Sequence, residues 1–296
     1  MKILVFGLSG QVGSIVKNNT QYDYNLISPK YKYIDMFNKD TLTDYIIENN
    51  PDVVLNLSAY TDVDGCEDNE EKAFNLNAYA PRMISKACSK TGSLLLHLST
   101  DYVYNQEGFN FITEDTTLNP KSIYGKSKYL GEKYILENCS KYIILRTSWI
   151  YSDFGKNFYL TIKNLLNKKI SVSVVNDQFG APTLAYDLVN AIFKILKFME
   201  SKKYININLD NFYGVYNISN KGNVSWFNFA NEIATALSYN SLEKVKPITT
   251  KEFGAIASRP LNSLLDNSKL IKTFGIIMPY WKDSFDLFFK NNYLKD

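Results

Sequence analysis

The segment KILVFGLSGQVG (residues 2–13) decides how the N-terminal half of this chain folds. Its first five residues, 2–6, form an apolar run that predicts a buried strand of a parallel sheet. Glycines then follow in the pattern G-x-x-G-x-x-G, and residues 11–19 predict a helix. Glycines in such a turn let backbone N–H groups and a helix N-terminus approach a pyrophosphate. The order of strand, glycine turn and helix therefore predicts a dinucleotide site.

Three further apolar runs predict strands of the same sheet, at residues 53–57, 93–98 and 143–145. Helical stretches separate them, at residues 40–49, 70–91 and 122–137. Continuous apolar strands that alternate with helices are typical of a parallel sheet covered on both faces. Right-handed crossovers then make the sheet doubly wound. The predicted fold class is therefore α/β, with a doubly wound parallel sheet.

The pattern becomes less regular after about residue 150. Helices are predicted at residues 157–167, 186–198 and 226–237, and strands at residues 171–175 and 214–218. We expect residues 1–150 to form a dinucleotide-binding domain, to which segments near 184–220 return. Residues 151–183 and 221–296 are expected to form a smaller, mainly C-terminal lobe that binds the substrate.

The composition is that of a globular protein, because 45% of the 296 residues are hydrophobic and 21% are charged. No apolar run approaches the roughly 18 residues of a membrane span, so we expect no membrane insertion. The N-terminus is interpreted as the first strand and not as a signal peptide. The widely spaced Cys66, Cys88 and Cys139 match neither a disulfide framework nor a metal knuckle, which favours a reducing, cytoplasmic location.

The charged residues and the histidine exclude several classes of function. Only three of the 33 basic residues are arginines, and the lysines are scattered among acids, so nucleic acid is not an expected partner. The single histidine, His97, excludes a His-ligated zinc site and most histidine-based catalysis. It falls within a predicted strand, and we interpret it as a hydrogen-bonded core histidine. Acid–base chemistry is then expected from tyrosine, lysine or carboxylates.

The segment after the second expected strand bears on the choice of dinucleotide. An acidic residue there would bind the adenosine 2′-hydroxyl, but residues 26–30 contain none. Ser28 and Lys30 could instead hold a 2′-phosphate, and Asp35 with Met36 could border the adenine. This pattern favours NADPH, with NADH as the alternative.

A tyrosine and a lysine are placed for proton transfer. Tyr124 and Lys128 are four residues apart, and therefore lie on one face of a predicted helix. The same spacing occurs at Tyr129/Lys133 and at Tyr159/Lys163. The segment Ser99–Tyr102 lies at the carboxyl end of a predicted strand, where ligands bind in open α/β sheets. Of the three pairs, only Tyr124 and Lys128 lie at the start of the helix that follows this segment. Within the segment, Thr100 supplies a hydroxyl that can polarise a carbonyl group, although a turn-capping role is the alternative.

Electrostatics predicts that the lysine tunes the tyrosine. An ammonium group about 5 Å from a phenol, at an effective dielectric near 20, contributes roughly 3 kcal/mol toward the phenolate. This energy corresponds to about two pKa units. We therefore expect the pKa of Tyr124 to lie close to the working pH.

These motifs, in their order, resemble those of the extended short-chain dehydrogenase/reductases, and among them the dTDP-4-dehydrorhamnose reductase family. Besides the glycine turn, the resemblance is carried by SAYTDVD (58–64), STDYVY (99–104), YGKSK (124–128), RTSWIY (146–151), NF (157–158), NDQFGAPT (176–183) and SRPLNS (258–263). It extends from residue 1 to about residue 285. It implies a Rossmann-type domain and a smaller lobe that hold a nucleotide sugar between them, and it is compatible with a homodimer.

The resemblance also implies roles for individual residues. The expected cofactor contacts are Gly7, Gly10, Gln11, Val12, Gly13, Ser58, Ala59, Tyr60 and Lys128. Tyr124 is expected to donate the proton, while Lys128 binds the nicotinamide ribose. The expected substrate contacts are Thr100, Asp101, Tyr124, Trp149, Asn157 and Arg259. An arginine suits a diphosphate because its guanidinium offers bidentate donors, but a structural ion pair between the lobes is the alternative for Arg259.

Two departures from the family pattern concern the cofactor pocket and a metal. Ser58 and Tyr60 stand where relatives often carry Ala and His. Some members of the family bridge a dimer through magnesium and glutamates, but Ile15 and the Ala185–Tyr186 region carry no acid. We therefore expect no metal site.

The function implied by the resemblance is NAD(P)H-dependent reduction of the 4-keto group of dTDP-4-dehydro-L-rhamnose to dTDP-L-rhamnose, for surface polysaccharide synthesis. Two alternatives stay open. One is a reductase or epimerase of another nucleotide-linked keto sugar, and the other is a non-catalytic, cofactor-binding regulatory subunit.

Overall fold

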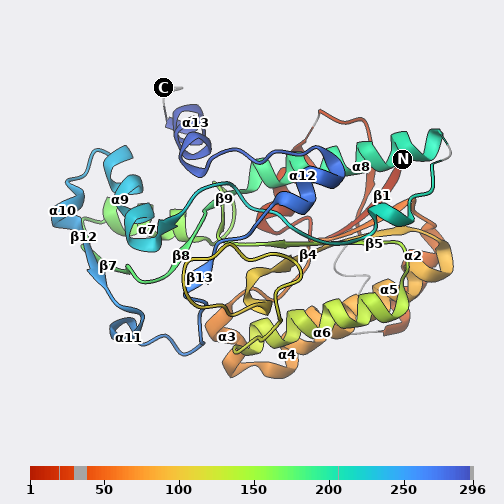
Figure 1. Ribbon diagram of the computed structural model, residues 1–296, viewed down its shortest axis with the longest axis horizontal. Helices are drawn as coiled ribbons and strands as arrows, with labels where there is room; N and C mark the ends of the chain where they lie inside the picture. Colours follow the sequence, from red (N-terminus) through yellow and green to blue (C-terminus); the bar gives the residue numbers. More distant parts are fainter. Residues whose placement is uncertain (20, 30–38, 206, 294–296) are drawn as a thin grey trace.

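The computed structural model describes residues 1–19, 21–29, 39–205 and 207–293 (Figure 1). Of the residues singled out in the sequence, Lys30, Asp35 and Met36 lie outside this described part.

A six-stranded parallel sheet forms the centre of the fold, in the order β10-β5-β4-β3-β1-β2. Its strands are β1 (Lys2–Phe6), β2 (Asn25–Ile27), β3 (Val53–Asn56), β4 (Leu94–Thr100), β5 (Tyr142–Thr147) and β10 (Gly214–Asn217). The order reverses direction next to β1, as in a doubly wound sheet. The predicted α/β fold class is therefore confirmed.

Successive side chains of each strand point to opposite faces of the sheet. Apolar side chains therefore lie on both faces, and helices cover both of them. On one face, Leu4 and Phe6 of β1 pack in a core with α2 (Lys39–Asn49), α5 (Ala80–Thr91) and α6 (Ile123–Asn138). On the other face, Ile3 and Val5 pack in a second core with α1 (Gln11–Asn18), α8 (Ala185–Tyr204) and α12 (Ser268–Phe274). Figure 1 shows α8 and α12 above the sheet and α5 and α6 below it.

A separate core lies among the elements that follow β5. It contains buried aromatic residues such as Tyr151, Phe229 and Phe285. The helices are α7 (Phe158–Asn167), α9 (Trp226–Ala236), α10 (Ser241–Lys244), α11 (Thr250–Phe253) and α13 (Trp281–Tyr293). The short strands are β6 (Ile150–Tyr151), β7 (Val172–Val175), β8 (Phe179–Gly180), β9 (Thr183–Leu184), β11 (Val224–Ser225), β12 (Val245–Ile248) and β13 (Asn262–Ser263).

Segments from the second half of the chain return to the first core. Strand β10 pairs with β5, and α8 packs on α1 within the range that we expected near 184–220. In addition, Leu270 and Phe274 of α12 pack in the core of the central sheet, which the sequence did not suggest.

The helix predicted over residues 70–91 is interrupted. It consists of α4 (Glu70–Phe74), a π-helical turn at Asn75–Tyr79 and α5, and it is preceded by α3 (Val63–Asp68). The π turn places the buried Asn77 so that its side chain bonds both backbone groups of Tyr60 and the hydroxyl of Ser127. Such π-bulges are frequent at functional sites, and this one joins the segment after β3 to α6.

Candidate active site

The glycine turn between β1 and α1 brings its backbone very close to neighbouring segments. Gly7 has a φ of +92°, and a Cβ at this position would lie 2.8 Å from the backbone nitrogen of Ser58. A Cβ at Gly13 would collide with the carbonyl oxygen of Gly7. Both positions therefore require glycine on steric grounds.

A cavity of about 230 Å³ opens beside this turn. Its lining includes Gly7, Gly10, Ser28, Pro29, Ser58 and Ala59. Gly10, the N-cap of helix α1, makes no side-chain cap in the part of the chain that the structure describes, and the N–H groups of the first helical turn suit an anion. The buried Nε2 atom of Gln11 also has no hydrogen-bond partner within the described ranges. These features fit the phosphate-bearing end of a dinucleotide.

The remaining expected cofactor contacts lie around this turn. Val12 and Gly13 are buried in the first turns of α1, and Ser58 and Ala59 follow β3 at the carboxyl end of the sheet. Tyr60 is half-buried and is fixed through its backbone by Asn77.

At the carboxyl end of β4, Thr100 joins Tyr124 to a buried carboxylate. The phenol of Tyr124 lies beside the side chain of Thr100. The Oγ1 atom of Thr100 donates to Oδ1 of Asp101 at 3.1 Å, and Oδ2 of Asp101 accepts from Oγ of Ser263 at 2.5 Å. Burial raises the pKa of Asp101 to about 6. The structure therefore brings together Thr100, Asp101 and Tyr124, three of the expected substrate contacts.

The pKa of Tyr124 differs from the expectation. Burial raises it above its usual value, and the neighbouring Thr100 side chain only partly offsets this effect. Lys128 is not among the groups that lower it. The expected lowering by the lysine is therefore wrong for the free protein, because burial of the phenol sets the direction of the shift.

Lys128 lies in the interior, with only 1% of its surface exposed. Its Nζ atom donates to the backbone oxygen of Leu98 at 2.6 Å and lies 3.2 Å from Nε2 of His97. Burial lowers the pKa of Lys128 to about 8, against an opposing effect of Glu132. The interpretation of His97 as a buried, hydrogen-bonded histidine is confirmed, but its contact with Lys128 was not anticipated.

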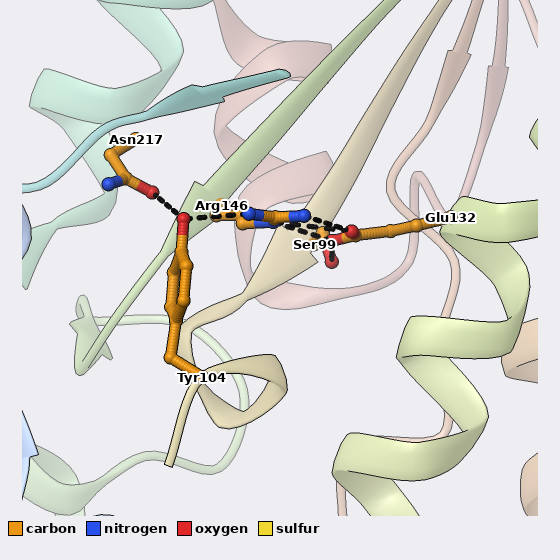
Figure 2. Close-up of polar contacts among 5 residues, drawn as sticks. All are labelled: Ser99, Tyr104, Glu132, Arg146 and Asn217. Atoms are coloured by element: carbon orange, nitrogen blue, oxygen red, sulfur yellow. Dashed lines mark hydrogen bonds and ion pairs between the residues drawn. The ribbon is translucent and has the colours of Figure 1, made fainter. Parts of the chain in front are cut away.

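One turn further along α6, Glu132 forms a buried ion pair with Arg146 of β5, at 2.6 Å. Figure 2 shows the guanidinium group between this carboxylate and the hydroxyl of Tyr104, which in turn donates to Asn217 of β10. Ser99 also donates to Glu132. The network ties α6 to three strands of the sheet, and so fixes the helix that carries Tyr124 and Lys128.

Trp149 stands at the start of the second lobe in a strained backbone conformation, with a φ of +52°. Its indole stacks on Trp226 with ring centroids 3.5 Å apart. A Cβ at Gly180 would lie 2.7 Å from Cε2 of Trp149, so the glycine allows β8 to pack directly on the ring.

The two other expected substrate contacts already have protein partners. Asn157 caps α7 by accepting from the N–H of Leu160, and it donates to the backbone oxygens of Ser152 and Phe154. Arg259 pairs with Asp64 at 2.5 Å and contacts the hydroxyl of Tyr102 at 3.4 Å.

Sequence reasoning missed several residues of this site. They are Asn56, Asp64, Tyr102, Trp226 and Ser263. Asn56 could have been identified from the sequence, because it is a polar residue at the end of a buried apolar strand. The other four depend on contacts between distant parts of the chain.

Together, the doubly wound sheet, the glycine turn and the pair of Tyr124 and Lys128 define a protein of the extended short-chain dehydrogenase/reductase class. Comparison with known proteins agrees: the family model described as RmlD substrate binding domain matches residues 1–294. The chain belongs to this family.

Its relatives cover almost the whole chain. The dTDP-4-dehydrorhamnose reductase of Salmonella typhimurium is 33% identical over an alignment of 290 positions that covers 95% of each protein. The crystal structure of a dTDP-4-dehydrorhamnose reductase from Clostridium acetobutylicum superposes with a TM-score of 0.89 at 35% identity and covers 99% of both chains. The Bacillus anthracis enzyme of the same name, solved in complex with NADP, gives a TM-score of 0.88 at 32% identity, with 98% of this chain and 99% of that one covered.

None of the helices in the described part of the chain is both long and apolar enough to cross a bilayer.

Proposed function

We propose that this protein is an NADPH-dependent reductase that converts the 4-keto group of dTDP-4-dehydro-L-rhamnose into the hydroxyl group of dTDP-L-rhamnose. The observation that carries the proposal is the meeting of Tyr124 with Thr100 and the buried Asp101 at the carboxyl end of the sheet, beside a glycine turn that fits a dinucleotide. The reductase names of full-length relatives at 32–35% identity support the choice of substrate.

In this proposal, NADPH supplies the hydride that reaches the keto carbon, and the protein supplies the proton. Tyr124 is protonated at neutral pH, since burial raises its pKa, and it therefore holds a proton ready for the forming alkoxide. Thr100 orients the phenol and the keto oxygen, and Lys128 holds the nicotinamide ribose. Gly10, Gln11 and Val12 hold the pyrophosphate at the start of α1.

The substrate lies between two lobes in this proposal. Residues 1–150 with the segments near 184–220 form the cofactor domain, and residues 151–183 and 221–296 contribute the substrate side. Trp149 packs against the sugar with Trp226 behind it, and Arg259 binds the diphosphate. All three cysteines are buried and form no disulfide, which supports a cytoplasmic location.

The test is oxidation of NADPH in the presence of freshly generated dTDP-4-dehydro-L-rhamnose, followed by the absorbance of the reduced nicotinamide. Product identity is checked by chromatography against dTDP-L-rhamnose. A panel of other nucleotide-linked keto sugars, and NADH in place of NADPH, serve as comparisons. Faster turnover of another keto sugar would reassign the substrate. If NADPH bound but none of the keto sugars oxidised it, an enzymatic function would be contradicted.

A further inference from the structure

The last residue of β5 is a buried threonine whose hydroxyl the fold does not use. Thr147 is 3% exposed, and its Oγ1 atom has no hydrogen-bond partner among the residues that the structure describes. A hydroxyl group both donates and accepts, so a buried one without a partner is unfavourable. Such groups are rare in folded proteins, and a ligand that supplies the missing partner is one reason for them.

Thr147 stands beside Thr100 at the carboxyl end of the sheet, because the two residues are partners in the pairing of β4 with β5. Side chains two residues apart on a strand share a face. Leu145, two residues before Thr147, packs in the core that contains Val12 of α1. Leu98, two residues before Thr100, packs against the same core. Both threonines therefore face the side of the sheet on which α1 lies.

Helix α1 contributes a second buried polar atom of this kind. The Nε2 atom of Gln11, the first residue of α1, likewise has no partner within the described ranges. A Cβ at Gly155 would lie 3.5 Å from Cβ of Gln11, so the chain that leaves β5 at Thr147 reaches α1 by Gly155. The two polar groups thus stand at the two ends of one stretch of the sheet edge, from α1 to β5.

The next residue, Ser148, faces a different part of the molecule. Its hydroxyl contacts the backbone oxygen of Ser263 on β13 at 3.5 Å. Ser148 therefore faces the side to which the substrate is assigned, whereas Thr147 faces the side of the glycine turn and the cofactor.

A dinucleotide bound at the glycine turn extends along this edge toward Tyr124, which lies beside Thr100. Its nicotinamide ring carries one polar substituent, a carboxamide, with an oxygen that accepts and an NH₂ group that donates. A threonine hydroxyl can bond either end of this group. The carboxamide is attached to the ring carbon next to the one that gives up the hydride, just as Thr147 is the neighbour of Thr100 on the next strand.

We propose that the hydroxyl of Thr147 binds the carboxamide of the nicotinamide and so fixes the rotation of the ring. Thr147 is then a cofactor-binding residue that nothing in the sequence singled out. The consequence for catalysis rests on the proposed function: a ring held at Thr147 presents its hydride-donating carbon beside Thr100 and Tyr124.

The variant T147V removes the hydroxyl and keeps the shape of the side chain. Its affinity for NADPH, measured by fluorescence titration, should fall about 3- to 10-fold, the size of one net hydrogen bond. Its affinity for 2′-phospho-ADP-ribose should be unchanged, since that molecule has no nicotinamide. T147S keeps the hydroxyl and should bind NADPH as the wild type does. An equal loss for both ligands overturns the proposal. Unchanged NADPH affinity also overturns it, and a raised KM for the keto sugar would then assign the hydroxyl to the substrate.

The stability of the free protein separates this role from a structural one. Because Oγ1 of Thr147 bonds nothing in the described part of the chain, T147V should leave the free energy of unfolding in urea unchanged or raise it. A hydroxyl that held a trapped water molecule would be needed for stability, so a destabilised T147V protein overturns the proposal.

The matched control is T91V, near the amino end of β4, where Oγ1 of Thr91 donates to the backbone oxygen of Ala87 at 3.1 Å. This variant loses a hydrogen bond that the fold does use, so it should be less stable and keep both affinities. None of these binding and unfolding measurements needs a sugar. If they give the expected results and no keto sugar is reduced, the role of Thr147 stands and the proposed reaction fails. If NADPH reduces the sugar but T147V binds it normally, the reaction stands and the role of Thr147 fails.

Discussion

The guanidinium of Arg259 donates to a carboxylate oxygen of Asp64 at 2.5 Å, which joins the segment before β13 to helix α3. The two residues are 195 positions apart in the sequence. Asp64 presents to the arginine the kind of oxygen pair that a diphosphate would also present. The ion pair is partly exposed, with 23% of the arginine side chain and 37% of the aspartate side chain accessible, so it contributes little to stability.

We predict that Asp64 competes with the diphosphate for Arg259. In the D64N variant the arginine is held less strongly, so KM for the nucleotide sugar should fall severalfold. In R259K the forked donor is lost, and KM should rise roughly 10-fold or more, the size of one charge-assisted hydrogen bond. Steady-state kinetics measures both variants, and thermal melting shows whether either is destabilised. If both variants raise KM equally, the pair is structural and Arg259 does not bind the diphosphate.

Removal of the Tyr124 hydroxyl tests the proton donor. Y124F should lower kcat at least about 100-fold, because general acid catalysis contributes roughly that much or more. The affinity for NADPH, measured by fluorescence titration, should change less than about twofold, since the ring remains. The matched control is Y129F. It removes the hydroxyl from the tyrosine of the second pair on this helix, Tyr129 and Lys133, and should retain nearly full turnover. A Y124F enzyme with wild-type kcat would remove the tyrosine from the mechanism.

The central sheet could be predicted from the sequence because its signals are local. Strands such as β3, with the apolar run Val53–Leu55, stand out between turn residues because both faces of the sheet need apolar side chains. The glycine turn and the helical spacing of Tyr124 and Lys128 are local in the same sense. The expected elements of the sheet are accordingly found within a few residues of their predicted positions.

The contacts that give the site its chemistry could not be predicted in this way. Lys128 meets His97 across 31 residues, and His97 meets Asn56 across 41. The pKa of Tyr124 was misjudged for the same reason. The spacing of Tyr124 and Lys128 along the helix carries no information on burial, and burial by distant segments decides the direction of the shift.

The buried carboxyl of Asp101 predicts an unusual dependence of stability on pH. Burial raises its pKa to about 6 in the folded protein, above about 3.9 in the unfolded chain. Between these values the folded state binds more protons than the unfolded state, so the free energy of unfolding falls as pH rises from about 4 to about 6, and the loss is complete above that range. The loss is roughly 3 kcal/mol, at 1.36 kcal/mol for each pKa unit.

D101N lacks the titrating group and should lose this part of the slope. As the pH rises from 4 to 7, the free energy of unfolding of the variant minus that of the wild type should increase by roughly 2–3 kcal/mol. Urea unfolding at a series of pH values measures the difference, and the altered hydrogen bond to Ser263 adds only a constant. A stability difference that stays flat over this range would show that Asp101 ionises at its ordinary pKa.

The ion pair of Glu132 and Arg146 predicts a large loss of stability when only one partner is neutralised. Arg146 is 3% exposed, so E132Q leaves a buried guanidinium without its counter-charge and should cost about 3 kcal/mol in the free energy of unfolding. The double variant E132L/R146M buries no charge and should be clearly more stable than E132Q, within about 2 kcal/mol of the wild type. Urea unfolding of the three proteins compares them. Because the pair anchors α6, E132Q should also lower kcat, whereas a loss below about 1 kcal/mol would mean that the network of Figure 2 does not hold the helix in place.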